Sequence, residues 1–385
     1  MFVVDSSDDL IIESMNTSAI TAKQSRHVPR APGVAMLITS APPAPPVALG
    51  GLYLWEHIFN AELDHRMGGV WSYGTKKIGS ITFRFRTGPG VVPRKVPRES
   101  ENVLLVLNGR EASKVEFART WLDFLPALPR LRSAAVLLLG NEQCRNDWIK
   151  PYLTSRGGPL SHVFLVYDSA DIDNANFYQW PLGVATYRNF PKVASAGVPV
   201  STRRKYMCSF LGTLYHNSSR QLLLDVLERS PFKRSCYIKP RQEWQPQETA
   251  ETRDDYLQAL AQSDLTLNPV GQNTECYRIY EAMAYGSVPV VEDVMTPGDC
   301  GSSPASNVYP LRILKEHNAP VIYIKDWQTL PELLKQESRL SDHDKAKRRE
   351  DLLLWYENFK VSMREKMVRI LEEKFFNIRL KPLER

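Results

Sequence analysis

The sequence predicts an α/β protein with parallel sheets. Two regions of the chain, from residue 52 to about 202 and from about 205 to 324, alternate short apolar runs with segments of helical periodicity. This is the pattern of parallel strands joined by helices. The chain has 385 residues, of which 43% are hydrophobic and 24% charged, so it is long enough for two globular domains. We therefore expect two Rossmann-like domains.

The first alternation contains three apolar runs that we predict as strands, at residues 103–107, 136–139 and 163–167. Residues 115–125, between the first two runs, have apolar side chains at helical spacing. Chemistry in a parallel sheet collects at the carboxyl ends of the strands. The polar residues that follow these runs are therefore candidates for a site: Asn108, Arg110, Glu111, Asn141, Glu142, Asp168, Asp171 and Asp173.

The segment 263–294 is the clearest strand, helix and strand unit of the second alternation. Residues 265–267 and 288–291 are short apolar runs, as in buried parallel strands. Gly286 is predicted to end the helix in the left-handed conformation. One face of the helix is apolar and predicted to be core: Cys276, Ile279, Tyr280, Met283 and Ala284.

The opposite face of this predicted helix carries polar side chains. Asn273 or Thr274 is the expected N-cap, and a glycine-containing loop that enters a helix N-terminus suits a phosphate. Arg278 can add charged hydrogen bonds to that phosphate, and Glu281 can accept hydrogen bonds from the vicinal hydroxyls of a ribose. The alternative is that Arg278 and Glu281 are an ion pair on a solvated face.

The run RIYEA at 278–282, followed by Gly286 and by PVV at 289–291, resembles the donor-binding core of the exostosin-like glycosyltransferases. These enzymes have the GT-B architecture, two Rossmann-like domains with a cleft between them. The resemblance is closer to the ribitol-phosphate xylosyltransferases of α-dystroglycan glycosylation. It covers about residues 52–333 in seven ordered blocks: WEHIF (55–59), LNGRE (107–111), LLGNEQC (138–144), QWPLGVATYRNFP (179–191), FLGTLYHNSSRQ (210–221), WQPQET (244–249) and NTECYRIYEA (273–282).

The resemblance implies an inverting transfer of xylose from UDP-xylose to the ribitol-5-phosphate of the O-mannosyl core glycan on α-dystroglycan. UDP-xylose is then a donor substrate, no tightly bound cofactor is implied, and a divalent metal is possible but not required. The implied partners are the α-dystroglycan glycan and other dystroglycan-modifying transferases such as fukutin. The net charge of +6 suits an anionic partner, and no basic block interleaved with aromatic residues indicates nucleic-acid binding.

The resemblance also implies residue roles. Gly212, Thr213 and Arg220 match the loop and helix start that approach the donor diphosphate, beside Asn273, Thr274, Arg278 and Glu281. Inversion requires a base from the first domain that removes the proton of the acceptor hydroxyl. We predict Asp168 for this base, with Glu111 and His57 as the rival candidates.

The domain boundaries follow from composition. Residues 1–51 are polar and then Pro-rich, and we predict a disordered or linker segment. The acceptor domain is expected at 52–202, the nucleotide-sugar domain at 203–340 and an amphipathic helix at 341–385. No run of about 18 apolar residues occurs, although the resemblance implies a type II membrane protein of the Golgi. We therefore expect a chain without its membrane anchor.

Three alternatives remain open from the sequence. The chain can be an exostosin-like transferase that uses another UDP-sugar, or a non-catalytic glycan-binding protein of the same fold. Asp171 and Asp173 form a DxD, the metal signature of the GT-A architecture, but such a motif is frequent by chance. The five cysteines show no spacing typical of a zinc site, and some of them can pair in an oxidising lumen.

Overall fold

The structure, a computed structural model, describes residues 33–39, 51–63, 65–67, 71–245, 247–301 and 309–378. The chain divides into two compact units, Met1–Pro32 and Gly33–Arg385. The first unit lies outside the described residues, and everything below concerns the second unit.

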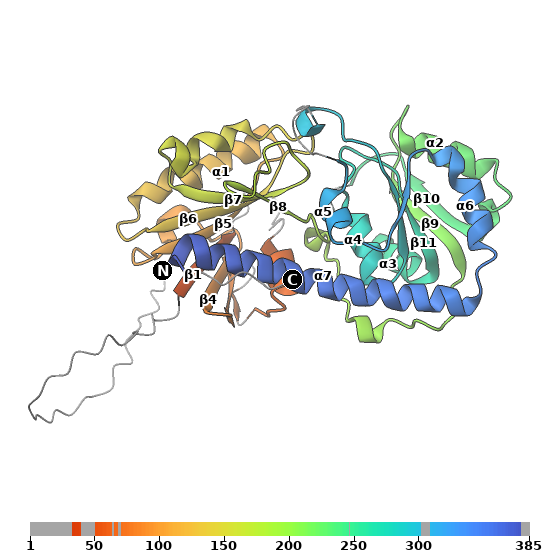
Figure 1. The fold of residues 1–385 in the computed structure, drawn as a ribbon, viewed down its shortest axis with the longest axis horizontal. Coiled ribbons are helices and arrows are strands. Elements are labelled where there is room, and N and C mark those ends of the chain that lie inside the picture. The colour runs from red at the N-terminus through yellow and green to blue at the C-terminus, as the bar shows by residue number, and fades with distance from the viewer. Residues whose placement is uncertain are drawn as a thin grey trace, which may run out of the picture. The chain divides into compact units, whose positions relative to one another are not determined.

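Two sheets form the framework of the described residues (Figure 1). The first has the order β2-β3-β4-β1-β5-β6-β7-β8, and the second the order β10-β9-β11-β12-β13. From β4 to β8 all pairs of the first sheet are parallel, and β2 and β3 extend it as an antiparallel edge. All pairs of the second sheet are parallel. The predicted α/β class with two Rossmann-like domains is confirmed.

The strands and helices have the following bounds. The strands are β1 Gly33–Thr39, β2 His65–Met67, β3 Trp71–Ile78, β4 Ile81–Thr87, β5 Asn102–Asn108, β6 Ser133–Leu139, β7 Leu160–Val166, β8 Phe177–Trp180, β9 Tyr206–Thr213, β10 Cys236–Arg241, β11 Ser263–Asn268, β12 Val288–Glu292 and β13 Ile322–Ile324. The helices are α1 Ala112–Phe124, α2 Ser219–Glu228, α3 Ala250–Gln262, α4 Tyr277–Ala284, α5 Arg312–Glu316, α6 Leu330–Glu337 and α7 Asp342–Phe376, with a short π-helix at Tyr53–Ile58.

The first sheet buries both of its faces, because alternate residues of its strands join different core clusters. Leu105 of β5 packs with α1 in a smaller cluster. Leu104 and Val106 face the other way and belong to the large cluster, which also holds the core of the second domain. The cores of the two domains are therefore continuous on that side of the first sheet.

Helix α7 connects the two domains. Figure 1 shows this long blue helix running from the second domain along the first sheet, and it packs against α4, β6 and the π-helix Tyr53–Ile58. The Ser341 side chain accepts a hydrogen bond from the Asp344 backbone N–H at 3.1 Å and caps the helix. One stripe along the helix is buried throughout: Leu352, Tyr356, Phe359, Met363, Met367 and Ile370.

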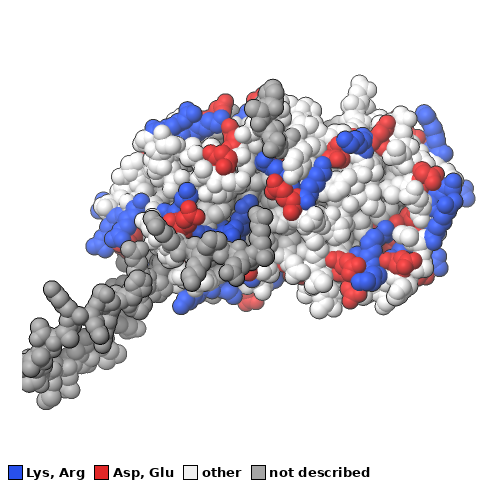
Figure 2. Space-filling view, viewed as in Figure 1, with Lys and Arg blue, Asp and Glu red and all other residues white. Residues whose placement is uncertain are grey.

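Charged side chains are mixed on the surface. On the face shown in Figure 2, Lys and Arg are interspersed with Asp and Glu rather than gathered in a single basic patch. None of the helices in the described residues has the length and apolar character that a membrane span requires.

The predicted linker 1–51 requires a correction at one place. Residues Gly33–Thr39 form β1, which pairs in parallel with β4 and β5 inside the first sheet. The run GVAMLIT is short, apolar and rich in β-branched residues, so it has strand character, but the Pro-rich sequence around it dominated the composition. The remaining residues of that segment, 1–32 and 40–50, lie outside the described residues.

We expect Met363→Ala to lower the free energy of unfolding by about 2–5 kcal/mol, because Met363 is fully buried in the core that α7 shares with both domains. Leu354→Ala on the same helix is the matched control, since Leu354 is 61% exposed, and it should cost less than about 0.5 kcal/mol. Urea denaturation followed by circular dichroism measures both. Equal effects of the two substitutions would contradict the packing of α7.

Candidate active site

A cavity of about 410 Å³ lies between the two sheets. Its walls come from residues that follow β5, β6, β7 and β8 of the first sheet, and from the end of β9, the loop after β11 and the start of α4 in the second. The cavity therefore lies at the carboxyl ends of the strands of both sheets, where parallel sheets bind their ligands.

Two guanidinium groups form the floor of the cavity on the side of the second domain. Arg220 lies in the first turn of α2 and Arg278 in the first turn of α4. Each has a glycine beside it: a Cβ atom at Gly212 would lie 2.5 Å from Nη2 of Arg278, and one at Gly271 would lie 2.4 Å from Nη2 of Arg220. The two glycines therefore leave room for the guanidinium groups in these positions.

These guanidinium groups have carbonyl and aromatic partners. Arg220 Nη1 donates to the Thr213 carbonyl at 2.6 Å, and Arg278 Nε donates to the Leu211 carbonyl at 3.2 Å. The Arg220 guanidinium also lies 4.8 Å from the centre of the Tyr215 ring. These contacts orient the two cations without neutralising their charge.

Within the part of the chain that the structure describes, neither Arg220 nor Arg278 forms an ion pair with a carboxylate. The Arg220 Nε and Arg278 Nη1 atoms are buried and have no hydrogen-bond partner there. Burial, together with the charge of Arg278, lowers the pKa of Arg220. Two adjacent guanidinium groups without an ion-pair partner in the described residues can bind an anion.

Two buried carboxylates of the α4 segment hold the first domain in place. The Glu281 carboxylate accepts hydrogen bonds from the Ala185 N–H at 3.0 Å and from the Tyr256 hydroxyl. The Glu275 carboxylate accepts from the Leu182 N–H at 2.9 Å. Burial raises the pKa of Glu281, so the alternative of a solvated ion pair with Arg278 is wrong.

The start of α4 differs from the prediction. The N-cap is Cys276, and Asn273 instead closes a turn by accepting the Glu275 N–H at 2.8 Å. The Asn273 amide also donates to the Glu142 carbonyl of the first domain at 2.7 Å. Thr274 does not line the cavity, because it is buried and bonded to Thr296 and Val294. Its role is to hold the loop.

The first domain contributes Arg110, Glu111 and Glu142 to the opposite wall of the cavity. Glu111 directly precedes α1 and its side chain is exposed. The Glu142 carboxylate lies 3.6 Å from Nη2 of Arg110. Of the three bases predicted from the sequence, Glu111 is the one that lines the cavity.

The other two predicted bases lie elsewhere. Asp168 is buried and accepts hydrogen bonds from the Gln179 side chain at 2.6 Å and from the Arg312 backbone N–H at 3.0 Å. Burial raises its pKa to about 6. His57 is buried beside Tyr53, and burial lowers its pKa to about 4. Neither residue is among those that line the cavity.

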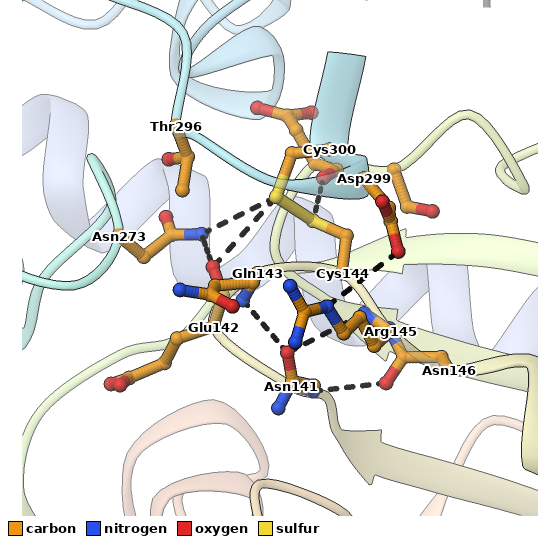
Figure 3. The surroundings of a disulfide bond; sticks show 12 residues. Asn141, Glu142, Gln143, Cys144, Arg145, Asn146, Asn273, Thr296, Asp299 and Cys300 are labelled. Atoms are coloured by element: carbon orange, nitrogen blue, oxygen red, sulfur yellow. Dashed lines mark hydrogen bonds and ion pairs between the residues drawn. A yellow bond between two sulfur atoms is a disulfide. The ribbon is translucent and has the colours of Figure 1, made fainter. Parts of the chain in front are cut away.

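A disulfide bond between Cys144 and Cys300 joins the two domains beside the cavity (Figure 3). It links the loop after β6 to the segment after β12. Arg145 and Asp299 are paired next to it at 3.8 Å. In Figure 3 the Glu142 carboxylate points away from the disulfide. The second disulfide, Cys208–Cys236, joins β9 to β10.

The predicted DxD has structural partners. Asp171 forms an ion pair with Lys150 at 2.7 Å, and Asp173 accepts hydrogen bonds from three backbone N–H groups in the turn before β8. Neither residue lines the cavity. Among the described residues, no group of three or more His, Cys, Asp or Glu side chains is arranged to hold a metal ion.

One cluster at the mouth of the cavity lies outside the site residues assigned from the sequence. Arg188 and Arg241 share the Glu248 carboxylate at 3.2 and 2.9 Å. The Arg188 guanidinium also lies 5.7 Å from the centre of the ring of Trp244, which is 55% exposed. The blocks QWPLGVATYRNFP and WQPQET contain Arg188, Trp244 and Glu248, so the family resemblance was the sequence feature that pointed to this cluster.

Comparison with known proteins gives concordant matches. The family models described as the RXYLT1 N-terminal and C-terminal domains match residues 47–181 and 187–376. The chain is 49% identical over 332 residues to ribitol-5-phosphate xylosyltransferase 1 of Danio rerio, which covers 85% of this chain and 76% of that protein. The Homo sapiens protein of the same name is 47% identical over 329 residues, or 84% of this chain and 74% of that protein.

Among solved structures, the catalytic domain of starch synthase IV from Arabidopsis thaliana, bound to ADP and acarbose, has a TM-score of 0.41 and 10% identity. It covers 87% of this chain and 100% of that chain. Two parallel-sheet domains with a cavity at their strand ends, together with relatives named as xylosyltransferases, define a glycosyltransferase. Both family models and the named relatives show that the chain belongs to the ribitol-5-phosphate xylosyltransferase family.

Glu275→Gln tests the buried carboxyl group beside the cavity. Burial raises the pKa of Glu275 from 4.5 to about 7, so folding favours the protonated form. The contribution of the protonated Glu275 to the free energy of unfolding is complete below pH 4.5 and is lost as the pH rises through 7. Between pH 5 and pH 8, we expect the variant to gain up to about 3 kcal/mol of unfolding free energy relative to the wild type.

Urea denaturation across this pH range measures the effect. Glu116→Gln, at an exposed position of α1, is the control and should show no such gain. A constant difference between Glu275→Gln and the wild type from pH 5 to pH 8 would contradict the burial of this carboxyl group.

Removal of the Cys144–Cys300 disulfide should destabilise the protein strongly. The bond closes a loop with a sequence separation of 156, and the chain-entropy model gives about 5 kcal/mol for a loop of that size. We expect Cys144→Ser/Cys300→Ser to lower the free energy of unfolding by up to this amount. Cys276→Ser is the control, because Cys276 is a free thiol. If the double variant and the wild type unfold with the same denaturation midpoint, the Cys144–Cys300 cross-link is ruled out.

Proposed function

We propose that this chain transfers xylose from UDP-xylose to the ribitol-5-phosphate of the O-mannosyl core glycan on α-dystroglycan, with inversion at the anomeric carbon. The names of the relatives support this donor sugar and acceptor. The observation that carries the proposal is the pair of a buried Arg220 and a partly buried Arg278, neither of which forms an ion pair with a carboxylate in the described residues. A nucleoside diphosphate supplies the counter-charge.

The donor is bound by the second domain. Its diphosphate lies against Arg220 and Arg278, where Gly212 and Thr213 allow close approach. Glu281 faces the ribose, and its carboxylate oxygens keep lone pairs beyond their bonds to Ala185 and Tyr256. Trp244, exposed at the mouth of the cavity, offers a stacking surface for the uracil ring. Asn273 and Thr274 hold the loop that leads into α4.

The acceptor is bound by the first domain, and transfer takes one in-line step. The acceptor oxygen attacks the anomeric carbon of xylose and forms the glycosidic bond while the bond to the UDP oxygen breaks. Glu111 takes the proton of the acceptor hydroxyl. Arg220 and Arg278 stabilise the charge that develops on the departing UDP. No metal ion is needed as the counter-charge, because the two arginines supply it.

We place this reaction in the Golgi lumen. The two disulfide bonds support an oxidising compartment. α-Dystroglycan as the protein that carries the acceptor, and fukutin as a partner in the pathway, remain predictions from the family resemblance.

A panel of UDP-sugars tests the proposal, with a ribitol-phosphate-capped acceptor and the product followed by mass. We expect a pentose increment from UDP-xylose alone. Arg278→Ala and Arg220→Ala should each raise the Kd for UDP-xylose about tenfold to hundredfold, because each removes charged hydrogen bonds to the diphosphate. Isothermal titration calorimetry measures the Kd.

Arg229→Ala is the control for these substitutions, because Arg229 is exposed at the end of the same helix as Arg220. It should leave the Kd within twofold. Transfer from a different UDP-sugar would show that the donor is not UDP-xylose. Saturable UDP-xylose binding without any transfer would favour a glycan-binding protein of the same fold.

A further inference from the structure

Arg110 is a second cationic centre of the cavity and lies on the wall opposite the donor arginines. It follows β5, next to Glu111, and its side chain lines the cavity. Two other cavity arginines, Arg188 and Arg241, share the carboxylate of Glu248 at the mouth of the cavity, whereas Arg110 pairs with Glu142. Arg110 is therefore a cation of the first domain that stands deep in the site rather than at its mouth.

The position of Arg110 is fixed from several sides. Its backbone N–H donates to the Asn108 side chain at 3.0 Å, and its carbonyl accepts from the Asn141 side chain at 2.9 Å. Its guanidinium lies between two aromatic rings, 5.7 Å from the centre of Tyr167 and 5.5 Å from the centre of Tyr277. Because the group is held in advance, a ligand that binds it loses little conformational entropy.

The Arg110 guanidinium has N–H groups that are not used by its protein partners. The ion pair with Glu142, at 3.6 Å, and the hydrogen bond to the Tyr167 hydroxyl both involve Nη2. The Nε atom is buried and has no partner among the described residues. A planar guanidinium with free N–H groups matches the oxygens of a phosphate group.

Tyr277 relates Arg110 to the donor site, because it is the first residue of α4 and directly precedes Arg278. Arg110 and Glu111 follow β5 and both line the cavity, so a phosphate on Arg110 would bring an acceptor to the wall that carries Glu111. This arrangement suits an acceptor that carries its nucleophilic hydroxyl a few bonds from a phosphate.

We propose that Arg110 binds the phosphate of the acceptor and thereby selects a polyol phosphate over a neutral polyol. The inference rests on the proposed function, because the phosphate belongs to the proposed acceptor. Glu142 is a positioning residue in this scheme, since it holds the guanidinium through Nη2 and leaves the other donors to the ligand. The Asn273 bond to the Glu142 carbonyl fixes Glu142 in turn.

Steady-state kinetics of Arg110→Gln with two acceptors tests this proposal. One acceptor ends in ribitol phosphate, and the other is the same glycan ending in neutral ribitol. We expect the KM for the phosphorylated acceptor to rise about tenfold to hundredfold. The KM for the neutral acceptor and the Kd for UDP-xylose should stay within twofold. Arg110→Lys should recover part of the effect, because it restores the charge without the planar fork.

Arg132→Gln is the matched control, since Arg132 belongs to the same domain and its side chain is 73% exposed. A rise in the UDP-xylose Kd of Arg110→Gln would assign Arg110 to the donor diphosphate and overturn the proposal. An equal loss with both acceptors would overturn it as well. An unchanged UDP-xylose Kd also shows that the variant is folded.

A binding experiment separates this inference from the proposed function. Calorimetry with free ribitol 5-phosphate, in the presence of UDP, compares the wild type with Arg110→Gln and needs no turnover. Binding that is lost in the variant supports the phosphate site even if xylose transfer is not observed. Equal binding of ribitol 5-phosphate, or none, to both proteins overturns it.

Discussion

The site depends on the cost of holding two like charges next to each other, one of them buried and the other partly buried. Burial of a guanidinium is expensive unless it is paired, and each of the two arginines, Arg220 and Arg278, adds to the cost of the other. The fold offsets part of this cost with the carbonyls of Thr213 and Leu211 and with aromatic rings. An anion that enters would relieve the remainder, so the proposed diphosphate site follows from the packing of β9, α2 and α4.

Helix α4 also sets the distance between the two walls of the cavity. Glu275, just before it, and Glu281, within it, accept backbone N–H groups of the segment that follows β8. The same helix therefore presents Arg278 to the cavity and fixes the first domain against the second. The disulfide Cys144–Cys300 adds a covalent link on the loop that carries Glu142. Donor and acceptor walls are held by one set of contacts.

Local patterns predicted the local features well. Alternating strands and helices gave the two sheets, and helical spacing gave the buried face of α4 and the left-handed Gly286, which has a φ of 65°. These local patterns could not predict which residues far apart in the sequence contact each other. Asp168 pairs with Arg312, which is 144 positions away in the sequence. The Asn273 side chain closes a turn and donates to the Glu142 carbonyl instead of capping α4. His57 has the right chemistry for a base, but its place in the core is a property of tertiary packing.

The carboxylates around the cavity fall into two groups by their surroundings. Glu275 and Glu281 are buried, and their oxygens already accept backbone N–H and tyrosine hydroxyl groups. A turn of either carboxylate toward an acceptor would break these bonds and leave buried donors unsatisfied, which costs about 1–3 kcal/mol for each donor. Glu111 has no such bonds to lose in the described residues and is exposed to the cavity. Arg110 pairs with Glu142 through Nη2 but keeps a buried Nε atom that has no partner among the described residues. Groups that the fold leaves unsatisfied are those available to a substrate.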